Sequence, residues 1–192
     1  MTAVRVAACE WIETTVIILK GAEKSRKQNR CYLGADGKIQ KVALTAHDGS
    51  SPGTIPRAPG PAGNKTDLKE YLDRAATLIH QYIPPNPRKV QAAKNAGRVA
   101  ISPQSGGGVD VTISEYLKVD DVLTITLDPT ARTLLGFNIA THVEEPADVV
   151  LLSVQMNTLP GGDLYAARTT LRAEARKIHV VITNTGHRPR AL

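Results

Sequence analysis

Aromatic residues are scarce in this sequence of 192 residues, at 4% of the composition, with one Trp (Trp11) and one Phe (Phe137). A domain of this length still needs a sizeable core. That core must therefore be filled mostly by Val, Ile, Leu and Ala. The two cysteines, Cys9 and Cys31, say little about the cellular compartment.

Long hydrophobic runs are also missing, because no stretch approaches the ~18 apolar residues of a membrane span. The box Val6-Ala7-Ala8-Cys9 has the form of a bacterial lipoprotein cleavage site. A working signal would need an apolar stretch of roughly 7–15 residues before the box. Only a short segment containing Arg5 precedes it. We expect the chain either to be cytoplasmic or to lack its true N-terminus.

No catalytic motif stands out. A Gly-x-Ser-x-Gly nucleophile motif is absent, and the Gly-rich segment 105–108 is typical of a hairpin turn rather than a phosphate loop. The pairs Asp120-Asp121 and Glu144-Glu145 are adjacent carboxylates, which point to opposite faces of a strand. They favour turn chemistry over an acid/base couple, and we expect no enzyme.

Metal ligands and cofactor motifs are equally sparse. His142 and Glu144 share one face of an expected strand, but a zinc site needs three or four converging ligands. The pair is more typical of a solvated strand end. His80 falls on an amphipathic helix, where boundary packing is the simpler interpretation. The sequence predicts neither a metal nor a cofactor.

The formal net charge is +6, and the excess of Lys and Arg lies before residue 101. Its densest part is the segment 24–30, KSRKQNR. Binding of single-stranded nucleic acid favours aromatic platforms interleaved with the charges, and only Tyr32 is close by. A solvated basic face is therefore favoured over a nucleic-acid interface.

Hydrophobic residues make up 42% and charged residues 22%, which is the composition of a globular protein. Alternation of apolar and polar residues, bounded by turn residues, predicts ten strands. The alternation is clear in Leu123, Ile125 and Leu127, which are separated by Thr124 and Thr126. The expected strands are 10–20, 25–33, 38–45, 98–102, 109–117, 121–128, 133–143, 149–158, 164–172 and 177–184.

Residues 46–65 are rich in Pro and Gly and predict a flexible loop. A helical insertion is expected over 66–97. Its first helix, 66–83, ends before Pro84, and a short second helix is capped by Asn86 and ends at Gly97. The sequence thus predicts one domain over 1–192, of class α+β, with a curved antiparallel sheet and a helical insertion.

A hairpin turn at residues 21–24 would place Cys31 opposite Thr14 rather than opposite Cys9. A Cys9–Cys31 disulfide is therefore not expected.

Long stretches of the chain resemble a group of bacterial proteins without assigned chemistry, many of them exported. The stretches are KSRKQNRCYLGADGKIQKV, YLDRAATLIHQYIPP, EYLKVDDVLTITLDPTARTLLGFNIATHVEEPADVVLLSVQMNTLPGG and ARTTLRAEARKIHVVITNTGHRP. The order of strands, helical insertion and strand meander is similar to outer-membrane lipoprotein carriers of the LolA/LolB type. That resemblance implies a half-open barrel whose helices cover an apolar concavity that carries acyl chains. The low aromatic content and the lack of an export signal depart from that pattern.

The leading hypothesis is a non-enzymatic envelope or periplasmic protein that binds a lipid-like or other apolar ligand on a concave sheet. The expected lining residues are Leu123, Ile125, Leu127, Phe137, Ile139, Val154 and Met156. The same residues would equally form a closed core. Two alternatives stay open: an interaction or structural module that docks a protein partner, and a nucleic-acid binder that uses the basic half.

Overall fold

The computed structural model describes residues 9–48 and 63–190, which form a ten-stranded antiparallel sheet and two helices. The strands are β1 (Cys9–Leu19), β2 (Ala22–Leu33), β3 (Ile39–Asp48), β4 (Val99–Pro103), β5 (Val109–Ser114), β6 (Val122–Asp128), β7 (Thr133–His142), β8 (Val149–Thr158), β9 (Leu164–Ala173) and β10 (Ile178–Pro189). The helices are α1 (Gly63–Ile79) and α2 (Pro87–Asn95).

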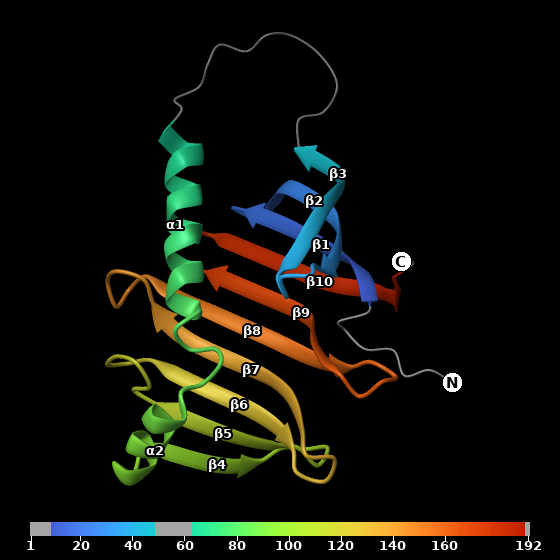
Figure 1. Cartoon of the computed structure of the whole chain (residues 1–192). Coiled ribbons are helices and arrows are strands. Elements are labelled where there is room, and N and C mark those ends of the chain that lie inside the picture. The colour runs from blue at the N-terminus through green and yellow to red at the C-terminus, as the bar shows by residue number, and fades with distance from the viewer. Residues whose placement is uncertain (1–8, 49–62, 191–192) are drawn as a thin grey trace.

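The sheet has the strand order β3-β2-β1-β10-β9-β8-β7-β6-β5-β4, with every pair antiparallel. Strands β4 to β10 follow one another as a meander. The first strand pairs with the last, so the N-terminal strands extend the same sheet. The helical segment joins β3 to β4, which lie at opposite edges (Figure 1). The α+β class with a curved antiparallel sheet and a helical insertion is confirmed.

Both helices lie on one face of the sheet, which we call the inner face (Figure 1). Helix α1 crosses one end of β8, β9 and β10, and α2 lies beside β4 and β5. The opposite, helix-free surface is the outer face. Neither described helix combines the length and the hydrophobicity of a membrane span.

Alternation along the strands produces two chemically different faces. On β6, Leu123 and Ile125 point inward, whereas Thr124 points outward and bonds across the ladder to Thr112. The inner side chains of the sheet and the helical segment form two buried clusters. In one, Tyr82 of the α1–α2 connection and Ala93 of α2 pack on Ile113, Leu123 and Ile139 of the sheet. In the other, Tyr71 of α1 packs on Val150, Ala173 and Ile178 of the sheet.

The end signals of the second helix are confirmed. The Asn86 side chain accepts a hydrogen bond from the Arg88 N–H at 2.9 Å, and Pro87 occupies the first helical position. Gly97 follows the helix with a φ of +71°. The predicted end of the first helix is wrong, because α1 ends at Ile79 rather than at residue 83. After Ile79 the chain leaves the helix, and the side chain of Tyr82 is fully buried in the core.

The expected loop over 46–65 is too long at both ends. Strand β3 continues to Asp48 because its backbone stays paired with β2, with Ala46 opposite Lys27 and Asp48 opposite Ser25. Helix α1 already begins at Gly63. The rest of the expected loop, 49–62, lies outside the described residues. A Pro- and Gly-rich composition therefore did not mark either boundary.

The predicted register of the first hairpin is wrong, although both thiols are free as expected. The chain turns at Lys20 and Gly21, whose φ values are +52° and +80°, and β2 begins at the next residue. Two residues with positive φ make the tight turn that suits twisted strands. Cys31 consequently lies opposite Trp11 rather than Thr14.

A buried carboxylate joins the helical segment to the sheet. Asp121 is 1% exposed and accepts backbone N–H bonds from Tyr116, Leu117 and Lys118 at 2.5–3.0 Å. It also accepts the Tyr82 hydroxyl at 2.6 Å, and the same hydroxyl lies 2.8 Å from that of Thr141 on β7. Burial and the neighbouring Asp121 carboxylate raise the pKa of Tyr82. The phenol therefore remains a donor to the carboxylate.

We expect Tyr82→Phe to lower the free energy of unfolding by about 1–3 kcal/mol, because it removes a donor from a buried carboxylate. Urea unfolding followed by circular dichroism measures the change. The matched control is Tyr32→Phe, since Tyr32 is only half-buried and its ring stacks on Arg190 at 3.9 Å. The control should change stability by less than about 0.5 kcal/mol. Equal stability of the two variants would mean that the backbone N–H groups alone satisfy Asp121.

Both thiols should be free and slow to react. Burial raises the pKa of Cys9 and of Cys31, with smaller contributions from Asp163 and Glu13, respectively. The thiolate is the reactive form, so Ellman's reagent should label the folded protein slowly and the unfolded protein rapidly. Intact mass after alkylation in denaturant, without reductant, should show two modified thiols. An unlabelled, bridged pair would contradict the structure.

Candidate functional site

Six of the seven predicted lining residues point to the inner face, and the sheet register brings them together. Ile125 on β6 lies opposite Phe137 on β7, which lies opposite Val154 on β8. Leu123 and Ile139 are opposite each other one row away. Together with Met156 these residues belong to or pack against one cluster. Leu127 lies beyond that cluster, opposite Leu134.

Burial of these residues decreases along the strands, away from the helices. Leu123 and Ile139 are 0% and 2% exposed. The neighbouring row is looser, because Phe137 and Val154 reach 8% and 9% and Ile125 is half-buried. The last row, which contains Leu127, Leu134 and Met156, is half-buried throughout. We call the four half-buried residues Ile125, Leu127, Leu134 and Met156 the open rows, and Phe137 and Val154 are buried beside them.

The helical cover stops before the open rows. Helix α1 packs through Tyr71, Leu68 and Leu72 on Ile178 and Val150, which lie at one end of their strands. The other ends of β6 to β10 carry no helix among the described residues (Figure 1). The apolar pattern of the sheet therefore extends further than the helices that bury it.

Helix α1 does not close tightly against the edge of its own cluster. An open hollow of about 310 Å³ lies between α1 and the adjoining ends of β1 and β10. Its lining includes Leu19, Leu68 and Ile178, with the cationic side chains of Lys20 and Arg176 at its border. Arg176 lies 4.4 Å from the ring of Tyr71, and the Tyr71 hydroxyl donates to Asp148 at 3.0 Å. These contacts hold α1 at the sheet while leaving the hollow accessible.

The inner face becomes polar towards β1, β2 and β3. The carboxylate of Glu13 accepts the ammonium of Lys41 at 2.7 Å and the amide of Asn29 at 3.3 Å. Next to it, the indole N–H of Trp11 donates to the amide oxygen of Asn184 at 3.1 Å. The inner face thus carries a polar, charged region on β1 to β3, separated from β8 by β10 and β9.

The basic segment 24–30 does not form a continuous positive surface. It lies in β2, where alternation sends Lys27 inward and both Arg26 and Arg30 outward. Arg26 pairs with Glu23 at 2.8 Å, and Arg30 lies 3.8 Å from Glu10. The arrangement weighs against the nucleic-acid hypothesis, because the charges are split between faces and partly neutralised.

The histidine and acidic positions considered for metal binding are not brought together. Glu144 pairs with Arg74 of α1, and His142 does not join it. Within residues 9–48 and 63–190 no three His, Cys, Asp or Glu side chains are grouped as metal ligands. The adjacent acids at 120–121 lie in the turn before β6, where the Asp121 carboxylate accepts hydrogen bonds from the backbone N–H groups of Tyr116 and Leu117.

Sequence reasoning missed the residues that close the covered end of the inner face. Tyr82 and Tyr116 lie with ring centroids 5.7 Å apart, over the cluster that contains Leu152. Tyr116 also accepts the backbone N–H of Asn86 at 2.7 Å. Leu152 could have been predicted from the sequence, because it shares the alternation of Val154 along the strand. The two tyrosines could not, because they lie in connections without a repeating pattern.

The chain matches no family model and no curated protein. Among solved structures it is similar to a LolA superfamily protein from Nitrosomonas europaea, with 8% identity and a TM-score of 0.38. The match covers 97% of this chain and 88% of that chain.

Proposed function

We propose that this chain is a non-enzymatic binding protein that holds a lipid-like or other apolar ligand on the inner face of its sheet. The observation that carries the proposal is the set of open rows, where apolar side chains continue beyond the helical cover. The binding surface comprises the seven residues named from the sequence, with Leu134 added by the fold. Leu123 and Ile139 form its buried floor.

Burial of apolar surface supplies the binding energy. At about 25 cal/mol per Å², a ligand that covers about 200 Å² gains about 5 kcal/mol before the cost of association. The polar region around Glu13, Asn29 and Lys41 lies on the same face, with β10 and β9 between it and β8. An amphiphile therefore fits this surface better than a purely apolar molecule, because its polar end can remain hydrated. The resemblance to exported proteins favours a periplasmic or envelope location for such a carrier. If no export signal precedes the chain, the expected location is the cytoplasm.

The proposal predicts saturable binding of a fluorescent fatty acid at micromolar concentration by delipidated protein. The double variant Ile125→Gln/Met156→Gln should weaken binding by about tenfold or more, because two half-buried apolar contacts become polar. Its matched control is Leu135→Gln/Val149→Gln, since these residues are 42% and 37% exposed and lie outside the open rows. Fluorescence titration, with circular dichroism to verify folding, gives the result. The proposal fails if the unaltered protein shows no saturation, or if both double variants bind alike.

A second candidate is a protein-interaction module that uses a sheet edge. Strand β3 is the last strand of the described sheet on one side, and Ile39, Val42 and Leu44 are 54%, 40% and 50% exposed. A strand edge with exposed apolar side chains is a template for pairing with another chain.

If the edge docks a second copy of this chain, sedimentation velocity should show concentration-dependent dimers. Val42→Lys should abolish them, because a lysine on an edge strand opposes pairing. Lys38→Ala, in the turn before β3, is the control and should leave them intact. A protein that stays monomeric at every concentration tested rules out this use of the edge.

A further inference from the structure

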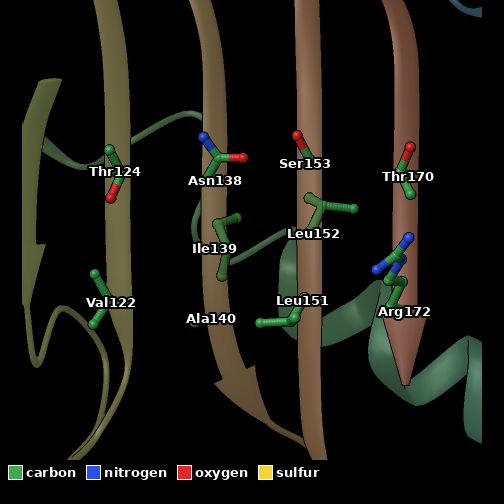
Figure 2. Close-up of a pocket in the computed structure, with 10 residues that line it drawn as sticks. All are labelled: Val122, Thr124, Asn138, Ile139, Ala140, Leu151, Leu152, Ser153, Thr170 and Arg172. Carbon is green, nitrogen blue, oxygen red and sulfur yellow. The ribbon is translucent and has the colours of Figure 1, made fainter. Parts of the chain in front are cut away.

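The outer face carries a hollow of about 380 Å³ on the side of the sheet away from α1 (Figure 2). It spans β6, β7, β8 and β9, which at about 4.8 Å between neighbouring strands makes it roughly 14 Å long. The outward-facing side chains that line it form two rows across these strands. This surface is separated from the proposed inner-face site by the sheet itself.

The hollow exists because a small side chain lies between larger ones. The register places Val122, Ala140, Leu151 and Arg172 in one row across the four strands. The methyl group of Ala140 leaves a depression between Val122 and Leu151, and Leu151 is 39% exposed. One end of this apolar trough is therefore occupied by a guanidinium.

The adjoining row is made of uncharged polar side chains. Thr124, Asn138, Ser153 and Thr170 follow one another across the same strands (Figure 2). Hydroxyl and amide groups of this kind donate hydrogen bonds to anionic oxygens. The hollow thus offers an apolar side, a row of donors and one cation.

The carboxylate of Glu174 lies two residues from Arg172 in the chain, and both residues line a second hollow together with His179. Among the described residues, ion pairs with carboxylates are formed by Arg26, Arg30, Lys41, Arg74, Arg98, Arg176 and Arg188. Arg172 forms none with the described residues, and its ladder neighbour across β10 is His179.

His179, the neighbour of Arg172 on β10, lies close to the positive charges of two arginines. Its Nε2 is buried without a hydrogen-bond partner in the described structure. Burial lowers the pKa of His179, repulsion from Arg172 and Arg168 lowers it further, and Glu174 only partly opposes this. The face around Arg172 therefore favours an added negative charge.

We propose that this outer hollow binds the anionic group of a small amphiphile, a carboxylate or a phosphate monoester carried on a short apolar chain. The guanidinium of Arg172 pairs with the anion, and Ser153 and Thr170 donate to its other oxygens. The apolar chain lies over Ala140, between Leu151 and Val122. The proposal is independent of the inner-face function, because it uses other residues on the opposite surface.

The test titrates the labelled full chain with octanoate, octyl phosphate and neutral octanol, and follows backbone amide shifts by NMR. The two anions should shift amides of β8 and β9 around Ser153 and Thr170 and bind about tenfold or more tightly than octanol. Arg172→Gln should weaken anion binding about tenfold or more. The matched control is Arg168→Gln, on the same strand and face but outside the hollow, which should change binding by less than about twofold.

Two results would overturn the proposal. One is the absence of saturable binding of both anions. The other is an equal loss in the Arg168 and Arg172 variants, which indicates general charge attraction. The variant Ile125→Gln/Met156→Gln should leave this outer binding unchanged, so failure of the inner-face function is distinguished from failure here.

As a further readout, saturating octanoate should raise the pKa of His179, because an anion offsets the charge of Arg172. An unchanged pKa would place the anion elsewhere and count against binding in the hollow.

A second arm identifies the source of the anion. Vesicles containing phosphatidic acid, whose headgroup is a phosphate monoester, are sedimented with the protein and compared with phosphatidylcholine vesicles. Binding to the anionic vesicles that is lost in Arg172→Gln and kept in Arg168→Gln assigns the hollow to a lipid headgroup in a membrane. Binding of soluble octanoate or octyl phosphate without such vesicle binding assigns it to a free small amphiphile.

Discussion

The carboxylate of Asp121 is surrounded by the sheet and receives four hydrogen bonds, three from backbone N–H groups and one from Tyr82. A buried charge is costly unless it is fully hydrogen-bonded, and four donors meet that condition. The bonds close the turn before β6 and fix the α1–α2 connection above it. Because Tyr116 also accepts the Asn86 N–H, the start of α2 is tied to the same turn. The reach of the helical cover over the inner face follows from this attachment.

That reach determines where apolar surface remains open. Tyr82, Ala93 and Tyr116 bury the rows that contain Leu123 and Ile139, and the cover ends before Met156 and Leu134. Tyr71 performs the corresponding role for α1, through its bond to Asp148. Two tyrosine hydroxyls thus anchor a helical segment that joins opposite edges of the sheet. The open rows follow from an apolar pattern longer than the segment that covers it.

The two faces of one sheet offer different chemistry at nearly the same strands. On β7, Phe137 and Ile139 face the helices, whereas Asn138 and Ala140 face outward into the hollow. Period-two alternation makes this separation automatic. An apolar ligand and an anionic group can therefore be held on opposite surfaces without competing. The proposed inner site depends on burial and the proposed outer site on charge, so salt should affect ligand binding at the two sites differently.

Local patterning by itself determined the existence of the ten strands but not all their ends, since β5 stops at Ser114 and β10 continues to Pro189. It also determined the second helix with its Asn86 cap and the inward side of six of the seven proposed lining residues. These features depend on side-chain period and turn chemistry, which act between neighbours in the chain. Tertiary structure decided the rest. The pairing of β1 with β10 joins distant segments, and the opposition of Cys31 and Trp11 depends on a two-residue turn at Lys20. The continuation of β3 to Asp48 comes from ladder pairing with β2. The burial of Asp121 comes from Tyr82, a partner 39 residues away. The boundary of the open rows and the hollow beside Arg172 likewise arise only when four strands are placed side by side, because each is formed by residues from several strands.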